Sequence, residues 1–301
     1  SLRYLAAGAA CIAANFGCRP TFALSALLCF PIFWPQITSL LQGLKSRSLP
    51  PRRALRAPAA VIIPALIVVL PLMAYNVARF GSPLDFGNDY QMTVTDMTRF
   101  VQPTANFLPS VGAYLFLPLR FTSEFPFIGM TPMAFREWGY YEPMAGGLFT
   151  ACPLLLLALA APFLRRRMHR SGYWGLATCS LALAVLLASF DSHTAGLGWR
   201  YICDFGWMMA IAALAPMLYL MHPGGDAIAA GAPDPSERNE PRRDVTKRHP
   251  MVLACVRGLV VAVLMASIIL AVLACFIPGR DDSLINNNPV LYDTVVAWFR
   301  L

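Results

Sequence analysis

Long apolar runs alternate with shorter polar stretches along the whole chain. A helix needs about 20 predominantly apolar residues to cross a bilayer. The apolar runs predict spanning helices at these positions: Leu5–Asn15, Thr21–Leu41, Ala57–Val77, Gly147–Leu164, Tyr173–Phe190, Tyr201–Met221 and Met251–Ile277. The first run is short and Arg19-Pro20 follows it, so we expect a truncated span or half of a helix pair. The pattern therefore predicts an all-α, polytopic transmembrane helix bundle of about six or seven spans.

Basic residues concentrate in the loops on one side of these predicted spans. Loops 42–56, 165–171 and 222–250 carry the following: Lys45, Arg47, Arg52, Arg53, Arg56, Arg165, Arg166, Arg167, Arg170, Arg238, Arg242, Arg243, Lys247 and Arg248. Loops rich in Lys and Arg stay in the cytoplasm, which predicts that loop 80–146 is extracytoplasmic. We expect a multi-pass protein of the plasma membrane, with the lipid bilayer as its principal partner.

The predicted organisation follows from these loops. It places membrane helices in 1–79, 147–221 and 251–277, and an aromatic-rich outer loop with interfacial helices in 80–146. A flexible cytoplasmic linker fills 222–250, and 278–301 forms an extracytoplasmic tail. The chain begins at Ser1 and enters an apolar run at once, so we expect a fragment that lacks its N-terminal part.

Composition supports the membrane interpretation. The 301 residues are 57% hydrophobic and 13% charged, whereas soluble domains average about 25% charged residues. The net charge of +8 comes mostly from the predicted cytoplasmic loops. The sequence contains no basic face interleaved with stacking aromatics, so we expect no nucleic-acid partner. All eight cysteines lie in or beside apolar runs without CxxC spacing, which predicts buried free thiols.

Loop 80–146 is too long and too aromatic for an ordinary connection. Between Asn106 and Ile128 its apolar runs are broken by prolines, so we expect helices that lie in the outer interface instead of spanning. Two interpretations stay open: an aromatic belt that sets the depth of the protein, or a lid over a cavity that opens outward.

The most specific polar cluster is Trp199-Arg200-Tyr201-Ile202-Cys203-Asp204, at the outer start of a span. Residues four apart share a helix face, so Arg200 and Asp204 can form an ion pair that anchors the helix end. Alternatively, Arg200 faces a cavity and binds a phosphate, because its planar fork of donors suits that group. Tyr201 would then add a hydroxyl or a stacking surface.

Two further clusters carry polar groups near the outer face. Asn76 and Arg79 lie one turn apart before the Gly81-Ser82-Pro83 turn, and Asp85 follows it. Arg19, within Gly17-Cys18-Arg19-Pro20, is predicted near the same face. Their simplest roles are helix capping, snorkelling toward headgroups and a helix break; binding a lipid phosphate is the alternative.

Motifs of common catalytic sites are absent from the sequence. It contains no P-loop, dinucleotide fingerprint, HExxH or GxSxG. The four histidines are far apart in loops and predict no metal site. The spans hold too few acidic residues for an ion or proton relay, which disfavours a transporter.

The ordered set of clusters resembles the GT-C type polytopic membrane glycosyltransferases, including protein O-mannosyltransferases and aminoarabinose transferases. The resemblance rests on Gly17–Pro20, Tyr75–Gly87, Gly146-Gly147-Leu148-Phe149 ahead of Pro153-Leu154-Leu155, and Arg200-Tyr201 with Asp204. It implies transfer of a sugar from a polyprenyl-phosphate donor to a glycan, lipid or protein acceptor at the outer face of the plasma membrane. It implies no cofactor beyond that donor, and leaves a divalent metal undetermined.

The resemblance also implies roles for individual residues. Arg200 and Tyr201 would meet the lipid-linked phosphate while Asp204 orients Arg200, with Arg79 and Arg19 as second-choice phosphate contacts. Asp85 and Asp89 would bind sugar hydroxyls. The catalytic carboxylate of the family usually lies in the first outer loop, which we expect in the missing N-terminal part, so no catalytic residue is assigned here.

Other functions stay open. A transporter or flippase of a lipid-linked or amphipathic substrate is the main alternative. Such proteins often have internal repeats and broken helices, whereas the break at Arg19-Pro20 has no evident counterpart in the sequence. A ligase or polymerase of surface glycans, or a non-catalytic scaffold, is a further alternative.

Overall fold

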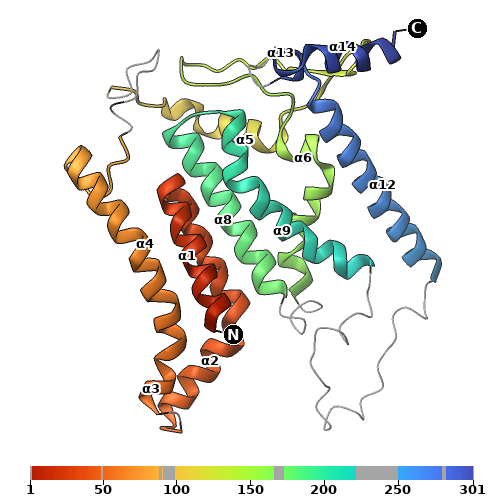
Figure 1. The fold of residues 1–301 in the computed structure, drawn as a ribbon. Coiled ribbons are helices and arrows are strands. Elements are labelled where there is room, and N and C mark those ends of the chain that lie inside the picture. The colour runs from red at the N-terminus through yellow and green to blue at the C-terminus, as the bar shows by residue number, and fades with distance from the viewer. Residues whose placement is uncertain are drawn as a thin grey trace. The chain divides into compact units, whose positions relative to one another are not determined.

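The fold is mostly helical, as the apolar runs predict (Figure 1). A computed structural model describes residues 2–48, 50–87, 90, 99–165, 173–221, 250–279 and 283–300. The chain divides into two compact units, Ser1–Val101 and Gln102–Leu301, so the boundary falls inside the predicted outer loop. Most of the predicted cytoplasmic loops 165–171 and 222–250 lies outside the described residues.

The first unit is built around a packed helix pair. Its helices are α1 (Leu2–Cys18), the 3₁₀ helix η1 (Pro20–Leu28), α2 (Cys29–Lys45), α3 (Pro51–Ala54) and α4 (Arg56–Phe80). Helix α1 packs along α4. A side chain at Gly17 would meet Leu72 of α4, with its Cβ 3.0 Å from Cδ1, so the glycine allows the close approach.

The predicted break at Arg19-Pro20 separates α1 from η1. Arg19 is extended, with φ −151°, and Pro20 cannot donate a backbone hydrogen bond to the preceding turn. The chain then continues as a 3₁₀ helix before α2 begins at Cys29. The predicted span 21–41 is therefore an apolar stretch of two helix types.

The described residues of the second unit form the following helices and one short hairpin. In chain order they are η3 (Thr104–Asn106), α5 (Phe107–Phe116), β1 (Arg120–Phe121), β2 (Ile128–Gly129), α6 (Leu148–Ala151), η4 (Pro153–Ala160), η5 (Pro162–Leu164), α8 (Tyr173–Thr194), η7 (Trp199–Tyr201), α9 (Ile202–Met221), α12 (Pro250–Ala274), α13 (Leu284–Asn287) and α14 (Pro289–Trp298). Strands β1 and β2 pair antiparallel, with Arg120 opposite Gly129.

Helices α8 and α9 form the centre of this unit, side by side in Figure 1. The two helices pack through buried apolar residues on both, which fill the space between them. The buried side chains are Ala184, Leu187 and Ala188 of α8 with Phe205, Met208 and Met209 of α9. Helix α5 packs against α8, and η4 packs against α9 and α12.

The predicted span Gly147–Leu164 is not one continuous helix. It consists of α6, η4 and η5, with Cys152 leaving helical geometry at φ −134° and ψ 77°. Pro153 and Pro162 begin the two 3₁₀ segments because proline lacks the donor that an α-helix needs. The Ser267 hydroxyl of α12 accepts a hydrogen bond from the Leu154 N–H at 3.1 Å, which satisfies a donor that the break exposes.

Five helical stretches of the described chain are long and apolar enough to cross a membrane. They are Pro20–Lys45, Arg56–Phe80, Tyr173–Thr194, Trp199–Met221 and Leu253–Ala274, and the apolar helix Leu2–Cys18 is shorter. These helices support a membrane-embedded, helical protein. The total of six or seven spans stays a prediction.

The surface of these helices explains one incorrect expectation. The eight cysteines are free, but none is buried. Apolar positions on a spanning helix face lipid as readily as they face a core, so an apolar run does not imply burial inside the protein.

Helix α4 also has a shallow apolar hollow of about 410 Å³, lined by Ile63, Leu66, Ile67, Leu70 and Pro71.

Candidate functional site: an arginine held by a tyrosine and a glutamate

The connection between α8 and η7 provides the scaffold of the site. The N–H groups of Ala195 and Gly196 both donate to the Asp191 carbonyl at 2.9 Å, and Gly196 turns the chain with φ +89°. A Cβ at Gly196 would lie 2.3 Å from the Tyr140 carbonyl oxygen. Only glycine combines this backbone conformation with so close a neighbour.

Two backbone hydrogen bonds hold loop 140–142 against this connection. The Leu197 N–H donates to the Tyr140 carbonyl at 3.0 Å, and the Glu142 N–H donates to the Leu197 carbonyl at 2.8 Å. The pairing is a parallel bridge between Tyr141 and Leu197. Alternate residues of an extended segment point to the same side, so Tyr140 and Glu142 project together.

Tyr114 of α5 supports the connection from inside. Its hydroxyl donates to the Gly196 carbonyl at 3.0 Å and accepts from the Gly198 N–H at 2.8 Å. Its side chain is 0% exposed and packs edge-on against Phe205 of α9. One hydroxyl thus satisfies two buried backbone groups, which would be costly to leave unpaired.

Buried polar residues in and directly before α5 also position the loop. Asn106 directly precedes α5, and Ser110 and Tyr114 follow within the helix at intervals of four. The Asn106 side-chain amide donates to the Glu137 carbonyl at 2.9 Å. The Gln102 side-chain oxygen accepts from the Tyr140 N–H at 3.2 Å. Together these contacts hold both ends of the 137–140 segment.

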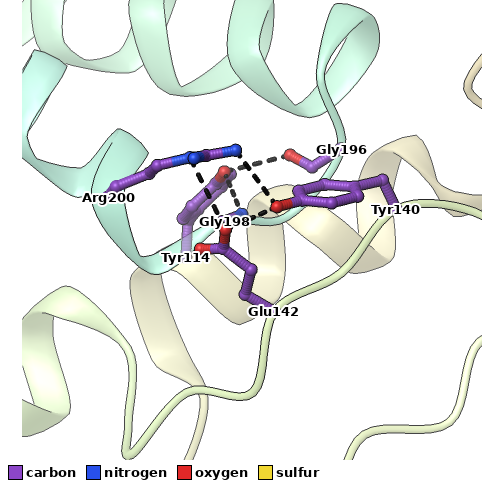
Figure 2. A network of polar contacts seen from close by, with 6 residues as sticks. All are labelled: Tyr114, Tyr140, Glu142, Gly196, Gly198 and Arg200. Carbon is purple, nitrogen blue, oxygen red and sulfur yellow. Dashed lines mark hydrogen bonds and ion pairs between the residues drawn. The ribbon is translucent and has the colours of Figure 1, made fainter. Parts of the chain in front are cut away.

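Arg200 lies over the two side chains that this loop presents (Figure 2). Its Nη2 donates to the Tyr140 hydroxyl at 3.1 Å, and its Nε is 3.5 Å from Glu142 Oε1. The Tyr140 hydroxyl donates to the same Glu142 oxygen at 2.5 Å. The three side chains form a closed network of two hydrogen bonds and one ion pair.

The guanidinium is fixed on one side and open on the other. Its carbon is 5.4 Å from the centroid of the Tyr201 ring, a cation–π distance. The Arg200 side chain is nevertheless 63% exposed. A cation that is both positioned and accessible can bind an anionic group without prior rearrangement.

Burial, together with the hydrogen bond to Glu142, raises the pKa of Tyr140 to about 12. Burial also raises the pKa of Tyr114. Both tyrosines are therefore neutral at physiological pH. Tyr140 keeps its proton for Glu142, and its oxygen lone pair stays available to Arg200.

Two of the residues that the sequence analysis predicted for the site, Arg200 and Tyr201, lie together here, and beside them is a carboxylate that it did not name. Asp204, the expected partner, is 2% exposed in the first turn of α9, and Glu142 forms an ion pair with Arg200. Whether Asp204 orients Arg200 stays a prediction. Tyr114, Tyr140 and Glu142 were missed as site residues; the only local signal was glycine at 196 and 198 before Arg200.

The remaining predicted residues belong to the first unit. Arg79 donates to the Tyr75 hydroxyl at 2.7 Å and lies over the Phe80 ring. The Asp85 carboxylate accepts from the Gly87 N–H at 2.8 Å, which stabilises the turn after α4. Arg19 is half-buried before η1, and Asp89 lies outside the described residues.

Asn76, the polar residue one turn before Arg79, has a structural role. The buried Asn76 amide donates to the Pro83 carbonyl at 3.2 Å, so the turn after α4 is held from its own helix.

Among the described residues, no group of three or more His, Cys, Asp or Glu side chains is placed to hold a metal ion.

Comparisons of the chain with family models, with curated proteins and with solved structures found no match in any of the three.

Proposed function

We propose that the chain is part of a membrane glycosyltransferase of the GT-C type. Its donor is a sugar on a polyprenyl phosphate, and its acceptor is a glycan, lipid or protein hydroxyl at the outer face of the plasma membrane. In this arrangement loop 80–146 is extracytoplasmic and the basic loops 42–56, 165–171 and 222–250 are cytoplasmic. Supporting observations are the apolar helices and the Arg200 site near the start of one of them.

The observation that carries the proposal is the exposed, fixed guanidinium of Arg200. Its 63% exposed side chain is held by Glu142 and Tyr140 beside a helix that is apolar enough to span a membrane. A lipid phosphate has this same combination of an anionic group and an apolar tail. Arginine suits phosphate because its planar fork can donate two parallel hydrogen bonds.

The chemistry of transfer gives Arg200 its role. As the bond between the anomeric carbon and the phosphate oxygen breaks, negative charge grows on the leaving phosphate. A preorganised cation at that position stabilises the transition state more than the ground state. The acceptor hydroxyl also needs a base, and we assign none within this chain.

Binding of polyprenyl phosphate tests the proposal. In detergent or nanodiscs, the parent protein should bind polyprenyl phosphate more tightly than the matching polyprenol, because only the former carries the anion. Arg200→Ala should weaken phosphate binding roughly ten- to hundredfold, the value of one charged hydrogen-bonding group. Binding of the polyprenol should not change.

Arg136→Ala is the matched control, because Arg136 is an exposed arginine of the same unit outside the network. It should retain full binding. Equal affinity of the parent for the phosphate and the alcohol, or unchanged phosphate binding by Arg200→Ala, would remove Arg200 from the donor site. Transfer of labelled sugar from the bound donor to an endogenous acceptor would then separate an enzyme from a binding protein.

One observation favours a transporter or flippase as the second candidate. The first unit contains the apolar 3₁₀ segment η1 and the second unit contains η4, each opened by a proline. Discontinuous apolar segments in two halves of a chain are typical of transporters, and η4 supplies the counterpart that the sequence did not reveal. Movement of a fluorescent polyprenyl phosphate across sealed vesicles, without sugar transfer, would favour this function.

A further inference from the structure

The C-terminal helix α14 has two apolar faces, of which only one is covered. Tyr292, Val295 and Val296 are half-buried and form its more covered face. The opposite face carries Val290, Leu291 and Trp298, whose exposed fractions are 75%, 45% and 72%. Val290 and Trp298 lie four residues on either side of Thr294, and Leu291 is three residues before Thr294 and seven before Trp298, so these positions share one side of the helix.

Aromatic contacts fix this helix beside the end of α12. Phe299, directly after α14, stacks on Phe125 with ring centroids 4.5 Å apart. Phe125 also contacts Phe276, just beyond the last residue of α12, at 5.2 Å. Figure 1 shows α14 turning away from the axis of α12 instead of extending it. The exposed face of α14 is therefore held near the C-terminal end of a candidate span.

The length of α12 is sufficient for a complete span. Its 25 residues rise about 37 Å at 1.5 Å per residue, more than the roughly 30 Å of a bilayer core. Ile269 and Val272, near its C-terminal end, are about half-exposed, as expected for side chains that contact acyl chains.

We propose that α14 lies flat in the headgroup–acyl boundary of the bilayer, with Val290, Leu291 and Trp298 inserted toward the acyl chains. Trp298 suits this depth because its ring is apolar and its N–H can reach polar headgroups. The adjacent Arg300 is exposed and can extend to lipid phosphates. The C-terminal segment is thus a membrane contact as well as a connection to the outer loop, and this does not depend on the transferase reaction.

Fluorescence quenching in vesicles tests the contact. The full chain is reconstituted in phosphatidylcholine with bromine at shallow or deep acyl positions, and the signal of Trp298 is obtained as the difference between the parent and Trp298→Phe. Shallow bromine should remove most of this signal, deep bromine less, and aqueous iodide little. Strong quenching by iodide without quenching by bromine would overturn the proposal.

A reporter on the flank of the same helix provides the control. Asp293 is exposed and lies off the apolar face, so Asp293→Trp in the Trp298→Phe background should give a signal that iodide quenches. Equal bromine quenching at both positions would mean that the helix is not oriented as proposed. A signal at Trp298 shielded from both quenchers would instead indicate a second copy on this face, and would also overturn the proposal.

Photolabelling of the unmodified chain gives an independent measurement. A phospholipid with a diazirine near the headgroup should label residues 289–300, as located by mass spectrometry. No label in this segment, while the end of α12 is labelled, would exclude the membrane contact even if the tryptophan variants failed to fold.

Discussion

Tyr114 stabilises the backbone beside Arg200, although the two residues are far apart in the sequence. Its buried hydroxyl is the acceptor for Gly198 and the donor to Gly196. Tyr114→Phe keeps the ring contact with Phe205 but leaves a buried N–H without its acceptor. The expected cost is about 1–3 kcal/mol of unfolding free energy, visible as a lower midpoint of thermal unfolding in detergent.

Tyr4→Phe is the control for that measurement, because Tyr4 on α1 is 83% exposed. Its midpoint should equal that of the parent. If Tyr114→Phe also unfolded with the parent, the hydroxyl would not support the connection, and the positioning of Arg200 would need another explanation.

At the scale of elements, the close packing of α6 against the end of α5 depends on Gly147. The Gly147 N–H donates to the Leu117 carbonyl at 2.8 Å. A Cβ at Gly147 would lie 2.5 Å from the Leu117 nitrogen and 2.6 Å from the Phe116 nitrogen. These are backbone atoms, which cannot rotate away. Gly147→Ala should therefore cost about 1–3 kcal/mol or more of unfolding free energy through overpacking.

Gly112→Ala separates this steric effect from a general effect of the substitution. Gly112 lies within α5 and has no heavy atom within 4 Å of the position of a Cβ. Alanine there should be neutral or stabilise by about 0.5–1 kcal/mol, since glycine is unfavourable inside a helix. Equal unfolding midpoints for the two variants would contradict the close packing of α6 on α5.

At the scale of the whole molecule, the topology predicts where two segments are exposed. An epitope inserted beside Trp138 in the full chain should be cleaved by protease added to intact cells, because loop 80–146 is expected outside. An epitope within 222–250 should be cleaved only after the membrane is opened, because basic loops stay in the cytoplasm. The reverse pattern would place Arg200 on the inner side and exclude transfer at the outer face.

Several elements were predictable from local pattern alone. The spans at Ala57–Val77, Tyr173–Phe190 and Tyr201–Met221 correspond to α4, α8 and α9, because a run of about 20 apolar residues in lipid can satisfy its backbone only as a helix. The break at Pro20 was predictable for the same local reason, since proline removes a donor. The fragmented course of 147–164 was not, although Pro153 and Pro162 marked its positions.

The residues of the candidate site also differ in whether a local sequence pattern indicates them. Arg200 and Tyr201 were recognisable because a charged residue beside an apolar run is costly and is usually kept for a purpose. Their supporting residues were not, because Tyr140 is 60 residues away from Arg200 in the chain. Contact over such a distance depends on how the α8–η7 connection pairs with loop 140–142, and no local pattern encodes that pairing.

The primary structure alone thus specified a helical membrane protein and one cation of interest, since both follow from the cost of placing polar groups near lipid. The tertiary structure brings Glu142 to Arg200. It also explains the glycine at 196, because a Cβ there would collide with the Tyr140 carbonyl oxygen. Glu142 faces Arg200 because two backbone hydrogen bonds and the Tyr114 hydroxyl bring separate segments together. Such long-range contacts are properties of the packed chain and not of any single stretch of it.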